Sequence, residues 1–587
     1  MKKISKNTLF FLIIFKANFL LAQYNNLWIP DTLSGTTFNL ILKDTFAQFR
    51  TGNQTITGAV NKSNFWGPTI IMRKGDAVNF NVTNKLNDST TIHWHGMHLP
   101  AIMDGGPHQI IPPGASWQPY WQVNNQAATL WYHPHLHEMT QQHVTKGIGG
   151  FIIIRDSTED ALPIPRKYGI DDIPLALTSR RFLTGNQMAF SLIDNYGDYE
   201  MVNGTLKAQL NLPKQVVRLR ILNGEIQRGY NIGFSDNSTF FVIANDDGLL
   251  DAPIPVTRLA VQTGERYEVL VDLTKATIGG TLDMIAYNSA SELQALTPGQ
   301  NIFGWPGNEG NPSNPTGNNG PINGGLLNNT NFNILRINIV ATTSNPITLI
   351  PVTLIKNNYW TTAEVSKSRT ITITGGQAGT AFSLDNAFFS LTKTNQTVNL
   401  GAVEKWTIVN NNIFGHAFHL HDVPFHIISR SGGNMGTNLR TYEQGWKDVV
   451  WIPISGSVTF LAKFEDYADS KWPYMYHCHA LTHEDEGMMA SFVVVNPAGI
   501  NQENYSDLDF MVSPNPVKDK LFVSSSNPAL KVYYIKIFDA AGRTIYMMPM
   551  PKLNEGIDMR NFKPGTYTIQ VTDEKFKQTI TKKFIVE

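Results

Sequence analysis

Short runs in which apolar and polar residues alternate dominate the chain after about residue 24. Such runs occur at residues 77–82, 216–222 and 267–271. A period of two is typical of β-strands, because successive side chains point to opposite faces of a sheet. No long amphipathic helical pattern interrupts these runs, and Gly, Pro and Asn often separate them. The pattern predicts an all-β protein built from sandwiches or barrels in series.

The length of the chain, 587 residues, suggests about four domains at roughly 150 residues each. We place three consecutive sandwiches at residues 23–158, 159–344 and 345–497. A polar linker follows near residues 498–507. The last segment, residues 508–587, has the pattern of a separate small β domain.

Residues 1–22 have the features of a secretory signal peptide. A basic start precedes a short apolar run at Leu9–Phe15, and small residues near Ala22 offer a cleavage point before Gln23. A membrane anchor is the alternative, but Lys16 interrupts the apolar stretch and leaves it too short to span a bilayer. We therefore expect an exported protein without a stable membrane span.

The composition limits the classes of function that need to be considered. Lys+Arg and Asp+Glu both number 47, and this zero net charge argues against a nucleic-acid-binding protein. Hydrophobic residues make up 42% of the chain, as expected for a folded globular protein. The single cysteine, Cys478, cannot form an internal disulfide. An unpaired thiol in an exported protein points to a chemical use for it.

All 15 histidines lie in two windows, residues 93–143 and 416–483. Within the windows five pairs are separated by two positions, which is far more than the frequency of histidine would give by chance. These pairs are His93/His95, His133/His135, His135/His137, His419/His421 and His477/His479. Because neutral imidazole is the commonest metal ligand in proteins, the pairs favour metal binding over a structural role.

The tripeptide His477-Cys478-His479 can serve two metal sites at once. On an extended strand its two imidazoles face one side and its thiolate faces the other, which gives electrons a covalent path between the sites. His419 and His421 likewise share a face, whereas His416 stands at odd offsets from both and can join the cysteine. His483 and Met488 follow Cys478 at +5 and +10. Two histidines, a cysteine and a distant methionine form the ligand set of a blue-copper site.

At these residues the chain resembles the multicopper oxidases. Four motifs of that family occur in order: His93-Trp94-His95-Gly96, His133-Pro134-His135, His416-Ala417-Phe418-His419-Leu420-His421, and His477-Cys478-His479 continuing to Met488. The resemblance covers roughly residues 24–497 and implies three cupredoxin-like Greek-key β-sandwiches. Ala417 departs from the family pattern, since many relatives carry proline there, but the position is not a ligand.

The resemblance implies four bound copper ions. The type 1 ion would bind His416, Cys478, His483 and, axially, Met488; Met489 is a rival that the +10 spacing disfavours. The type 2 ion would bind His93 and His419. The two type 3 ions would share the six other motif histidines, which are His95, His133, His135, His421, His477 and His479.

Asp104 and Glu484 resemble the acidic residues that such enzymes keep near the type 2 and type 3 ions. Reduction of dioxygen to water consumes four protons, and we expect the two carboxyl groups to relay them. The alternatives are a solvated carboxylate or a hydrogen bond that orients a ligand. We expect the five remaining histidines to be structural or to support ligands. They are His98, His108, His137, His143 and His426.

The implied activity transfers single electrons from a reducing substrate, through the edge of His416 or His483 and then Cys478, to dioxygen. The run Met103-Asp104-Gly105-Gly106-Pro107 after the first motif looks like that of bacterial laccases, spore-coat oxidases and bilirubin oxidases, which oxidise phenols, aromatic amines or tetrapyrroles. A cuprous or other metal-ion oxidase is the alternative, although no methionine-rich insert is present. A copper nitrite reductase, a non-catalytic copper-binding protein and an adhesive protein account for the histidines less well.

The last 80 or so residues are similar to the C-terminal (type A) sorting domains of type IX secretion cargo. The resemblance rests on the segments 511–516, 532–539, 541–543 and 563–567. It implies interaction with the secretion machinery, passage through the periplasm, and release or surface attachment outside the cell. A small accessory β-sandwich is the alternative.

Overall fold

A computed structural model provides the structure of the chain. It describes residues 24–190, 196–289, 326–327, 330–376, 381–412, 414–432, 439–496, 510–525, 532–549, 555–573 and 579–587. The predicted signal peptide and the predicted linker lie outside the described residues. Strands dominate, which confirms the all-β prediction. The α-helices among the described residues are short, namely α1 (Thr140–Thr145), α2 (Ser157–Asp160) and α4 (Leu481–Asp485). None of the described helices has the length and apolar character needed to cross a membrane.

The first sandwich packs two sheets around one apolar cluster that includes Trp94 and Trp121. One sheet has the order β2 (Thr32–Ser34), β5 (Thr69–Arg73), β11 (Gly150–Arg155), β10 (Ala128–His133) and β7 (His93–His95). The other has the order β4 (Thr55–Val60), β3 (Thr37–Ala47), β6 (Ala77–Lys85) and β8 (Ser116–Trp117), with β9 (Tyr120–Gln122) also paired to β6. The first two histidine motifs thus begin on the neighbouring strands β7 and β10.

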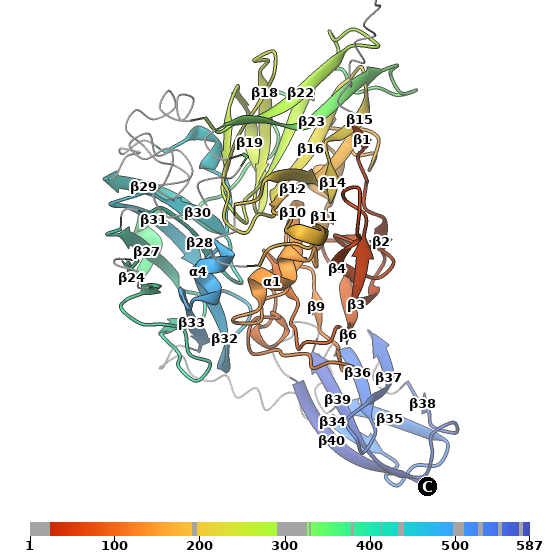
Figure 1. Cartoon of the computed structure of the whole chain (residues 1–587). Helices are drawn as coiled ribbons and strands as arrows, with labels where there is room; N and C mark the ends of the chain where they lie inside the picture. Colours follow the sequence, from red (N-terminus) through yellow and green to blue (C-terminus); the bar gives the residue numbers. More distant parts are fainter. Residues whose placement is uncertain are drawn as a thin grey trace, which may run out of the picture.

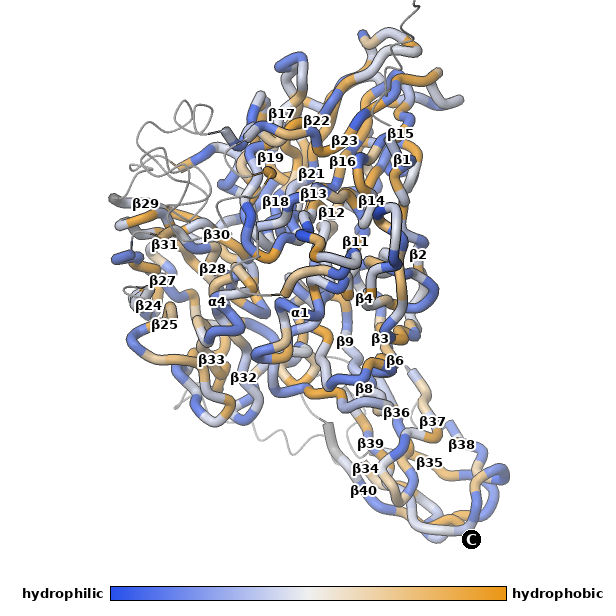
Figure 2. Tube along the Cα trace, viewed as in Figure 1, coloured by the Kyte–Doolittle hydropathy of each residue, from blue (hydrophilic) through white to orange (hydrophobic). Residues whose placement is uncertain are grey.

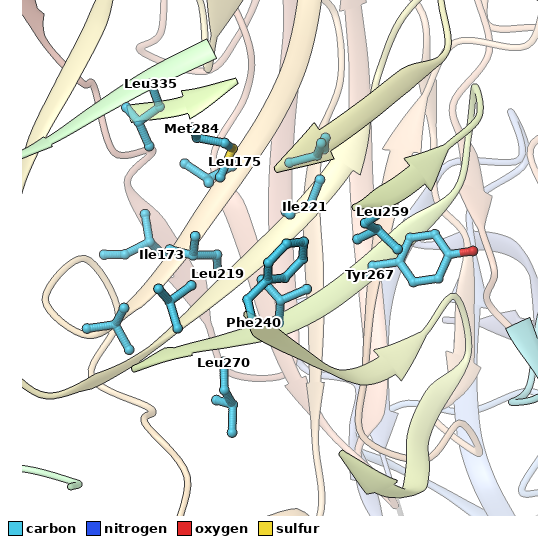
Figure 3. Packing of buried hydrophobic residues seen from close by; sticks show 14 of the residues in the cluster. Ile173, Leu175, Leu219, Ile221, Phe240, Leu259, Tyr267, Leu270, Met284 and Leu335 are labelled. Atoms are coloured by element: carbon cyan, nitrogen blue, oxygen red, sulfur yellow. The ribbon is translucent and has the colours of Figure 1, made fainter. Parts of the chain in front are cut away.

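The second sandwich contains the largest apolar cluster, which fills the space between its sheets (Figure 3). The first sheet has the order β1 (Asn25–Asn26), β15 (Ala208–Pro213), β23 (Asn331–Val340), β22 (Thr281–Tyr287), β17 (Tyr230–Phe234) and β20 (Leu259–Val261). The second has the order β14 (Thr205–Leu206), β13 (Tyr199–Val202), β12 (Asp172–Arg180), β16 (Val216–Asn223), β21 (Arg266–Asp272), β18 (Phe240–Asn245) and β19 (Gly248–Val256). The N-terminal strand β1 therefore joins a sheet of the second sandwich, where it pairs with β15.

Both faces of β16 are buried, although its sequence alternates between apolar and charged residues. Leu219 and Ile221 point into the apolar cluster. Arg218 and Arg220 point to the other side, where they are also buried. Arg220 donates hydrogen bonds to Asp172 at 2.6 Å and to Thr129 of the first sandwich at 2.7 Å. The second sandwich thus contacts the first through a layer of buried ion pairs, because these charges are paired rather than solvated.

The third sandwich carries the other two histidine motifs on adjacent strands. One sheet has the order β25 (Phe382–Leu384), β24 (Val365–Gly375), β27 (Val403–Asn410), β31 (Gly456–Lys463) and β29 (Phe425–Gly432). The other has the order β26 (Gln396–Asn399), β33 (Met489–Val495), β32 (Asp469–Cys478), β28 (His416–Leu420) and β30 (Val449–Ile452). Helix α4 follows β32 and contacts α1 of the first sandwich (Figure 1).

The C-terminal domain forms two small sheets around an apolar cluster of its own. They have the orders β34 (Phe510–Ser513), β35 (Lys520–Ser525), β38 (Ile557–Asp558), and β37 (Thr544–Pro549), β36 (Val532–Phe538), β39 (Gly565–Asp573), β40 (Thr579–Val586). The domain lies beside β6 and β9 (Figure 1), where the ring of Tyr534 contacts that of Tyr120 at 5.2 Å. Figure 2 shows apolar and polar residues alternating along its strands as they do in the sandwiches.

Candidate metal centre

One group of candidate ligands lies entirely within the third sandwich. Cys478 ends β32, His416 begins the neighbouring β28, and His483 lies in α4. The Cys478 Sγ is 3.6 Å from the Nδ1 atoms of both His416 and His483. All three side chains are buried. The structure thus brings together the thiol and the two imidazoles that the sequence assigned to one site.

Met488 belongs to the same neighbourhood. Its backbone N–H donates a hydrogen bond to the carbonyl of His483 at 2.8 Å, and its carbonyl accepts one from the N–H of Cys478 at 3.2 Å. Met489 instead lies opposite His477 in the β32–β33 ladder. Since directly paired residues share a face of an antiparallel sheet, Met489 lies on the face opposite that of Cys478. The register therefore favours Met488 over Met489.

The electrostatics of this group suit a cation. Burial raises the pKa of Cys478 to about 12, so the thiol keeps its proton unless a positive charge compensates the thiolate. Burial also lowers the pKa of His483 to about 4, which leaves the imidazole neutral. Neutral imidazole and metal-compensated thiolate are the forms in which these residues bind metals.

Eight further histidines form one buried cluster between the first and third sandwiches. In the first sandwich His93 of β7 pairs with His133 of β10, and in the third His419 of β28 pairs with His477 of β32. The Nε2 of His477 lies 3.1 Å from that of His135 and 3.2 Å from that of His421. The full set is His93, His95, His133, His135, His419, His421, His477 and His479.

Most of these rings are held by the nitrogen that faces away from the cluster. The Nδ1–H groups of five rings donate to backbone or carboxylate oxygens at 2.8–3.0 Å. These rings are His93, His133, His419, His421 and His477. The buried Nε2 atoms of His93, His133 and His419 have no hydrogen-bond partner among the described residues. Unpartnered lone pairs that converge in a buried site are what a metal ion would satisfy.

Burial disfavours a positive charge on most of the cluster imidazoles. Burial, and then the proximity of other histidines, lowers the pKa of His95, His135 and His421 well below the usual value. Burial lowers the pKa of His477 to about 3. Each such ring therefore has a nitrogen lone pair available near neutral pH.

Both predicted carboxyl groups touch the cluster. Asp104 Oδ2 accepts a hydrogen bond from His421 Nδ1 at 2.8 Å, and its backbone oxygen accepts one from His93. Glu484 Oε1 lies 3.2 Å from His135 Nδ1, and Oε2 lies 3.5 Å from His477 Nδ1. Burial, and then the neighbouring Asp485, raises the pKa of Glu484 well above its usual value. Burial therefore favours the protonated form of this carboxyl group.

Asp448 and Arg266 are part of the site although sequence reasoning missed them. Asp448 Oδ1 accepts a hydrogen bond from His95 Nε2 at 3.2 Å, and Arg266 donates to both carboxylate oxygens at 2.5 and 2.6 Å. A lone acidic residue before the apolar run 449–452 was the available signal for Asp448. Arg266 belongs to the second sandwich, which contains no histidine, so no local pattern points to it.

None of the five remaining histidines belongs to a metal-binding group in the described part of the chain. Their contacts are of other kinds. His98 pairs with Asp422 and Asp466, His143 hydrogen-bonds Thr90, His108 bonds the carbonyl of Leu391, His137 packs edge-on against Phe389, and His426 stacks on Tyr359.

A cavity lies against His483 at the border of the second and third sandwiches. Phe414, Trp451 and Tyr196 contribute its aromatic lining, and Gln227, Gln262 and Thr263 its polar lining. The Nε1 of Trp451 is buried and has no acceptor among the described residues. His416 does not line this cavity, and its Nε2 is buried as well. His483, and not His416, therefore borders this cavity, whose volume of about 10 Å³ holds about one water molecule.

Comparisons with known proteins agree with this geometry. Family models described as "Multicopper oxidase" match residues 43–159 and 362–498, and one described as "Secretion system C-terminal sorting domain" matches residues 511–587. The chain is 30% identical to the cell division protein FtsP of Xenorhabdus nematophila over 438 residues, which are 74% of this chain and 84% of that protein. It is 29% identical to the bilirubin oxidase of Albifimbria verrucaria over 439 residues, 73% of this chain and 71% of that protein.

Among solved structures, the laccase-like multi-copper oxidase CueO from Ochrobactrum sp. is similar, with a TM-score of 0.68 and 28% identity. The match covers 80% of this chain and 100% of that one. The ranges matched by the two multicopper oxidase models contain both groups of candidate ligands, whereas the sorting domain is matched separately.

Proposed function

The chain belongs to the multicopper oxidase family, and from that premise we propose that it couples one-electron oxidation of a small organic reductant to four-electron reduction of dioxygen to water. The reductants are phenols, aromatic amines or tetrapyrroles. The observation that carries the proposal is the arrangement around one tripeptide. Cys478 belongs to the three-residue group, and its neighbours His477 and His479 belong to the eight-histidine cluster.

Membership of the family implies that the chain binds copper, and we propose that it binds four ions. His416, Cys478, His483 and Met488 would hold the type 1 ion, and His93 and His419 the type 2 ion. The paired type 3 ions would be held by His95, His133, His135, His421, His477 and His479. When bound, the copper ions would supply the one-electron redox chemistry and the binding of dioxygen. The buried, unpartnered imidazole nitrogens fit such ions.

We assign the supply of protons to Glu484 and Asp104. Glu484 lies between His135 and His477, and the Thr140 hydroxyl donates to its Oε1 at 2.7 Å. Asp104 fixes the ring of His421 through Oδ2. A positioned carboxyl group can deliver protons to an oxygen atom that gains negative charge, and four protons are consumed per dioxygen.

The cavity beside His483 favours an organic reductant. A metal-ion substrate would be bound by carboxylate, thiolate or thioether groups, and the described residues that line the cavity include no acidic residue and no methionine. Since the cavity measures only about 10 Å³, a flat molecule with polar substituents would rest against these aromatic and amide groups rather than enter it. The buried N–H of Trp451, which has no acceptor among the described residues, would donate to a phenolic oxygen that reached it.

A role related to that of the cell division protein FtsP is the alternative that the 30% identity supports. A metal-ion oxidase is a further alternative. Consumption of oxygen with organic reductants distinguishes the proposal from both, because a protein without oxidase activity consumes none and a metal-ion oxidase prefers cuprous or ferrous ions.

The test is oxygen uptake by the copper-loaded full chain with a substituted phenol, an aromatic amine, bilirubin, Cu(I) and Fe(II). We expect four electrons to be taken from the reductant per dioxygen, which is four molecules of a one-electron reductant, with the organic compounds preferred in kcat/KM. Trp451→Phe should raise KM for phenols by about 10-fold, corresponding to one lost hydrogen bond. Trp117→Phe in the first sandwich is the matched control and should change nothing. A preference for metal ions, or no oxygen uptake, would refute the proposal.

The sorting domain implies export and a surface or extracellular location. We propose that the protein passes through the periplasm and that this domain engages the secretion machinery at the outer membrane. Deletion of residues 508–587 should retain the enzyme in the periplasm with its oxidase activity intact. Unchanged export of the shortened chain would refute this role.

A further inference from the structure

His95 is oriented differently from the other rings of the eight-histidine cluster. Its Nε2 lies 3.2 Å from Asp448 Oδ1, and its Nδ1 lies 3.2 Å from Nε2 of His479 inside the cluster. Five neighbouring rings are instead held through Nδ1, so that Nε2 faces inward. A hydrogen bond at one ring nitrogen decides which nitrogen keeps its lone pair. The hydrogen bond from His95 Nε2 to Asp448 therefore leaves Nδ1 as the nitrogen whose lone pair can bind a metal ion.

That partner is a carboxylate that is itself fixed from several sides. Arg266 donates to both oxygens of Asp448 in a fork, and the backbone N–H of Asp448 donates to Asp246 at 3.2 Å. The carbonyl of Asp448 also accepts the Nδ1–H of His419 at 2.8 Å. One residue thus orients two rings of the cluster, His95 through its side chain and His419 through its backbone.

Arg266 is held as firmly as the carboxylate. Its guanidinium is buried, and it donates to the carbonyls of Thr129, Gly264 and Asp246 at 3.0–3.1 Å in addition to Asp448. Gly96, directly after His95, has a φ of 85°, and a Cβ there would lie 2.8 Å from both Arg266 and Asp448. The close packing holds the guanidinium of Arg266 in one position, because each of its N–H groups donates to a fixed acceptor.

We propose that Asp448, held by Arg266, is a positioning residue that fixes His95 as an Nδ1 ligand, so that the second sandwich sets the geometry of a cluster to which it gives no ligand. This inference rests on the proposed function, since it concerns the same copper cluster. The bidentate fork holds the carboxylate in place and aims it at His95 Nε2. It therefore excludes the tautomer in which Nδ1 carries the proton and cannot bind a metal.

The first test compares Asp448→Asn with the wild-type full chain after copper loading. An amide between Arg266 and His95 can no longer accept from both, so copper should be retained in the histidine cluster about 10–100-fold less tightly. The near-ultraviolet absorption of the paired ions and the electron paramagnetic resonance signal of the type 2 ion should change. The visible absorption of the thiolate site should be unchanged, because the Asp448 side chain bonds His95 and Arg266 and not the Cys478 group.

Asp172→Asn is the matched control. Asp172 accepts a fork from Arg220 at 2.6 and 3.0 Å and is equally buried, but it touches no cluster histidine. Both substitutions should lower thermal stability, and only Asp448→Asn should alter the spectra of the cluster. If both variants, or neither, alter those spectra, the positioning role is wrong. If the wild type itself holds no copper in the cluster, the proposed function fails instead.

A second measurement does not depend on a variant that folds. A structure of the copper-loaded wild type should show His95 with Nδ1 towards the metal and Nε2 against Asp448. Arg266→Lys, which keeps the charge and loses the fork, should shift the spectra in the same direction as Asp448→Asn but less. A His95 ring that binds copper through Nε2 would overturn the inference.

Discussion

The two groups of candidate ligands are built in different ways. The Cys478 group comes from a single sandwich, and Cys478 and Met488 share one apolar cluster. The eight-histidine cluster lies between the first and third sandwiches and is surrounded by buried carboxyl groups. The second sandwich contributes Arg266, which bonds one of these carboxyl groups. The first group depends on local strand geometry, whereas the second depends on how whole domains are packed.

This difference indicates that the two groups should respond to different perturbations. A change in the apolar surroundings should alter the thiolate site alone, since strands β28 and β32 and helix α4 define it. A change in the contacts between domains should alter the histidine cluster first. The covalent link through residues 477–479 then makes the activity depend on both.

The largest effect is expected for Cys478→Ser. A hydroxyl cannot replace the thiolate ligand, so the visible absorption of the thiolate–copper bond should disappear and oxidase activity should fall to background. The near-ultraviolet absorption of the histidine cluster should persist. An active and coloured serine variant would contradict the assignment of Cys478.

His133→Ala removes one imidazole from the other group. We expect oxidase activity near background, because the cluster loses a ligand whose Nε2 has no partner among the described residues. The visible absorption of the thiolate site should remain and should be bleached by an organic reductant. Loss of both spectral signatures would show that the two groups do not form independently.

Glu484→Gln tests proton supply within the cluster. The amide cannot donate a proton, and we expect kcat to fall by about 100- to 10,000-fold with copper content unchanged. Glu200→Gln is the matched control, since burial also raises the pKa of Glu200 well above its usual value, far from the histidines. Equal activity of the Glu484 variant and the wild type would exclude the relay role.

The smallest effect is expected for His98→Gln, at a contact between the first and third sandwiches. Burial alone would lower the pKa of His98, but the charges and hydrogen bonds of Asp422 and Asp466 outweigh it and raise the pKa to about 10. The raised pKa contributes stability that is complete below about pH 6.5 and is lost as the pH rises towards 10.

At pH 6 the loss should be about 1.5–3 kcal/mol, as for hydrogen bonds to charged groups. It should appear as a lower midpoint of thermal unfolding for His98→Gln than for the wild type. The difference between the two midpoints should shrink as the pH approaches 10. A difference that is independent of pH would show that His98 is not protonated in the folded protein.

The sequence was sufficient to predict what is local in this molecule. The all-β fold follows from the period-two pattern. Spacings of two place His419 with His421, and His477 with His479, on one face of a strand. The family resemblance implied the full ligand sets, and His137 of the spaced pair His135/His137 packs against Phe389 instead. Asp104 and Glu484 could be identified from the sequence because they lie beside the histidine motifs.

The remaining features depend on packing over long distances in sequence. Arg266 and Asp448 are 182 positions apart, and nothing near either residue indicates the other. Alternation of apolar and charged residues along β16 would by itself direct Arg218 and Arg220 to solvent, but contact with the first sandwich buries them. The pairing of β1 with β15 is equally remote from any local pattern. No rule of strand periodicity specifies which face another domain will cover.

The most direct test of two separate sites is the number of copper ions per chain in the purified full-length protein and in Cys478→Ser. Two groups that assemble separately predict four ions in the wild type and three in the variant, with the missing ion accounting for the visible absorption. Equal copper content in the two proteins, or a wild type with a single ion, would contradict the account.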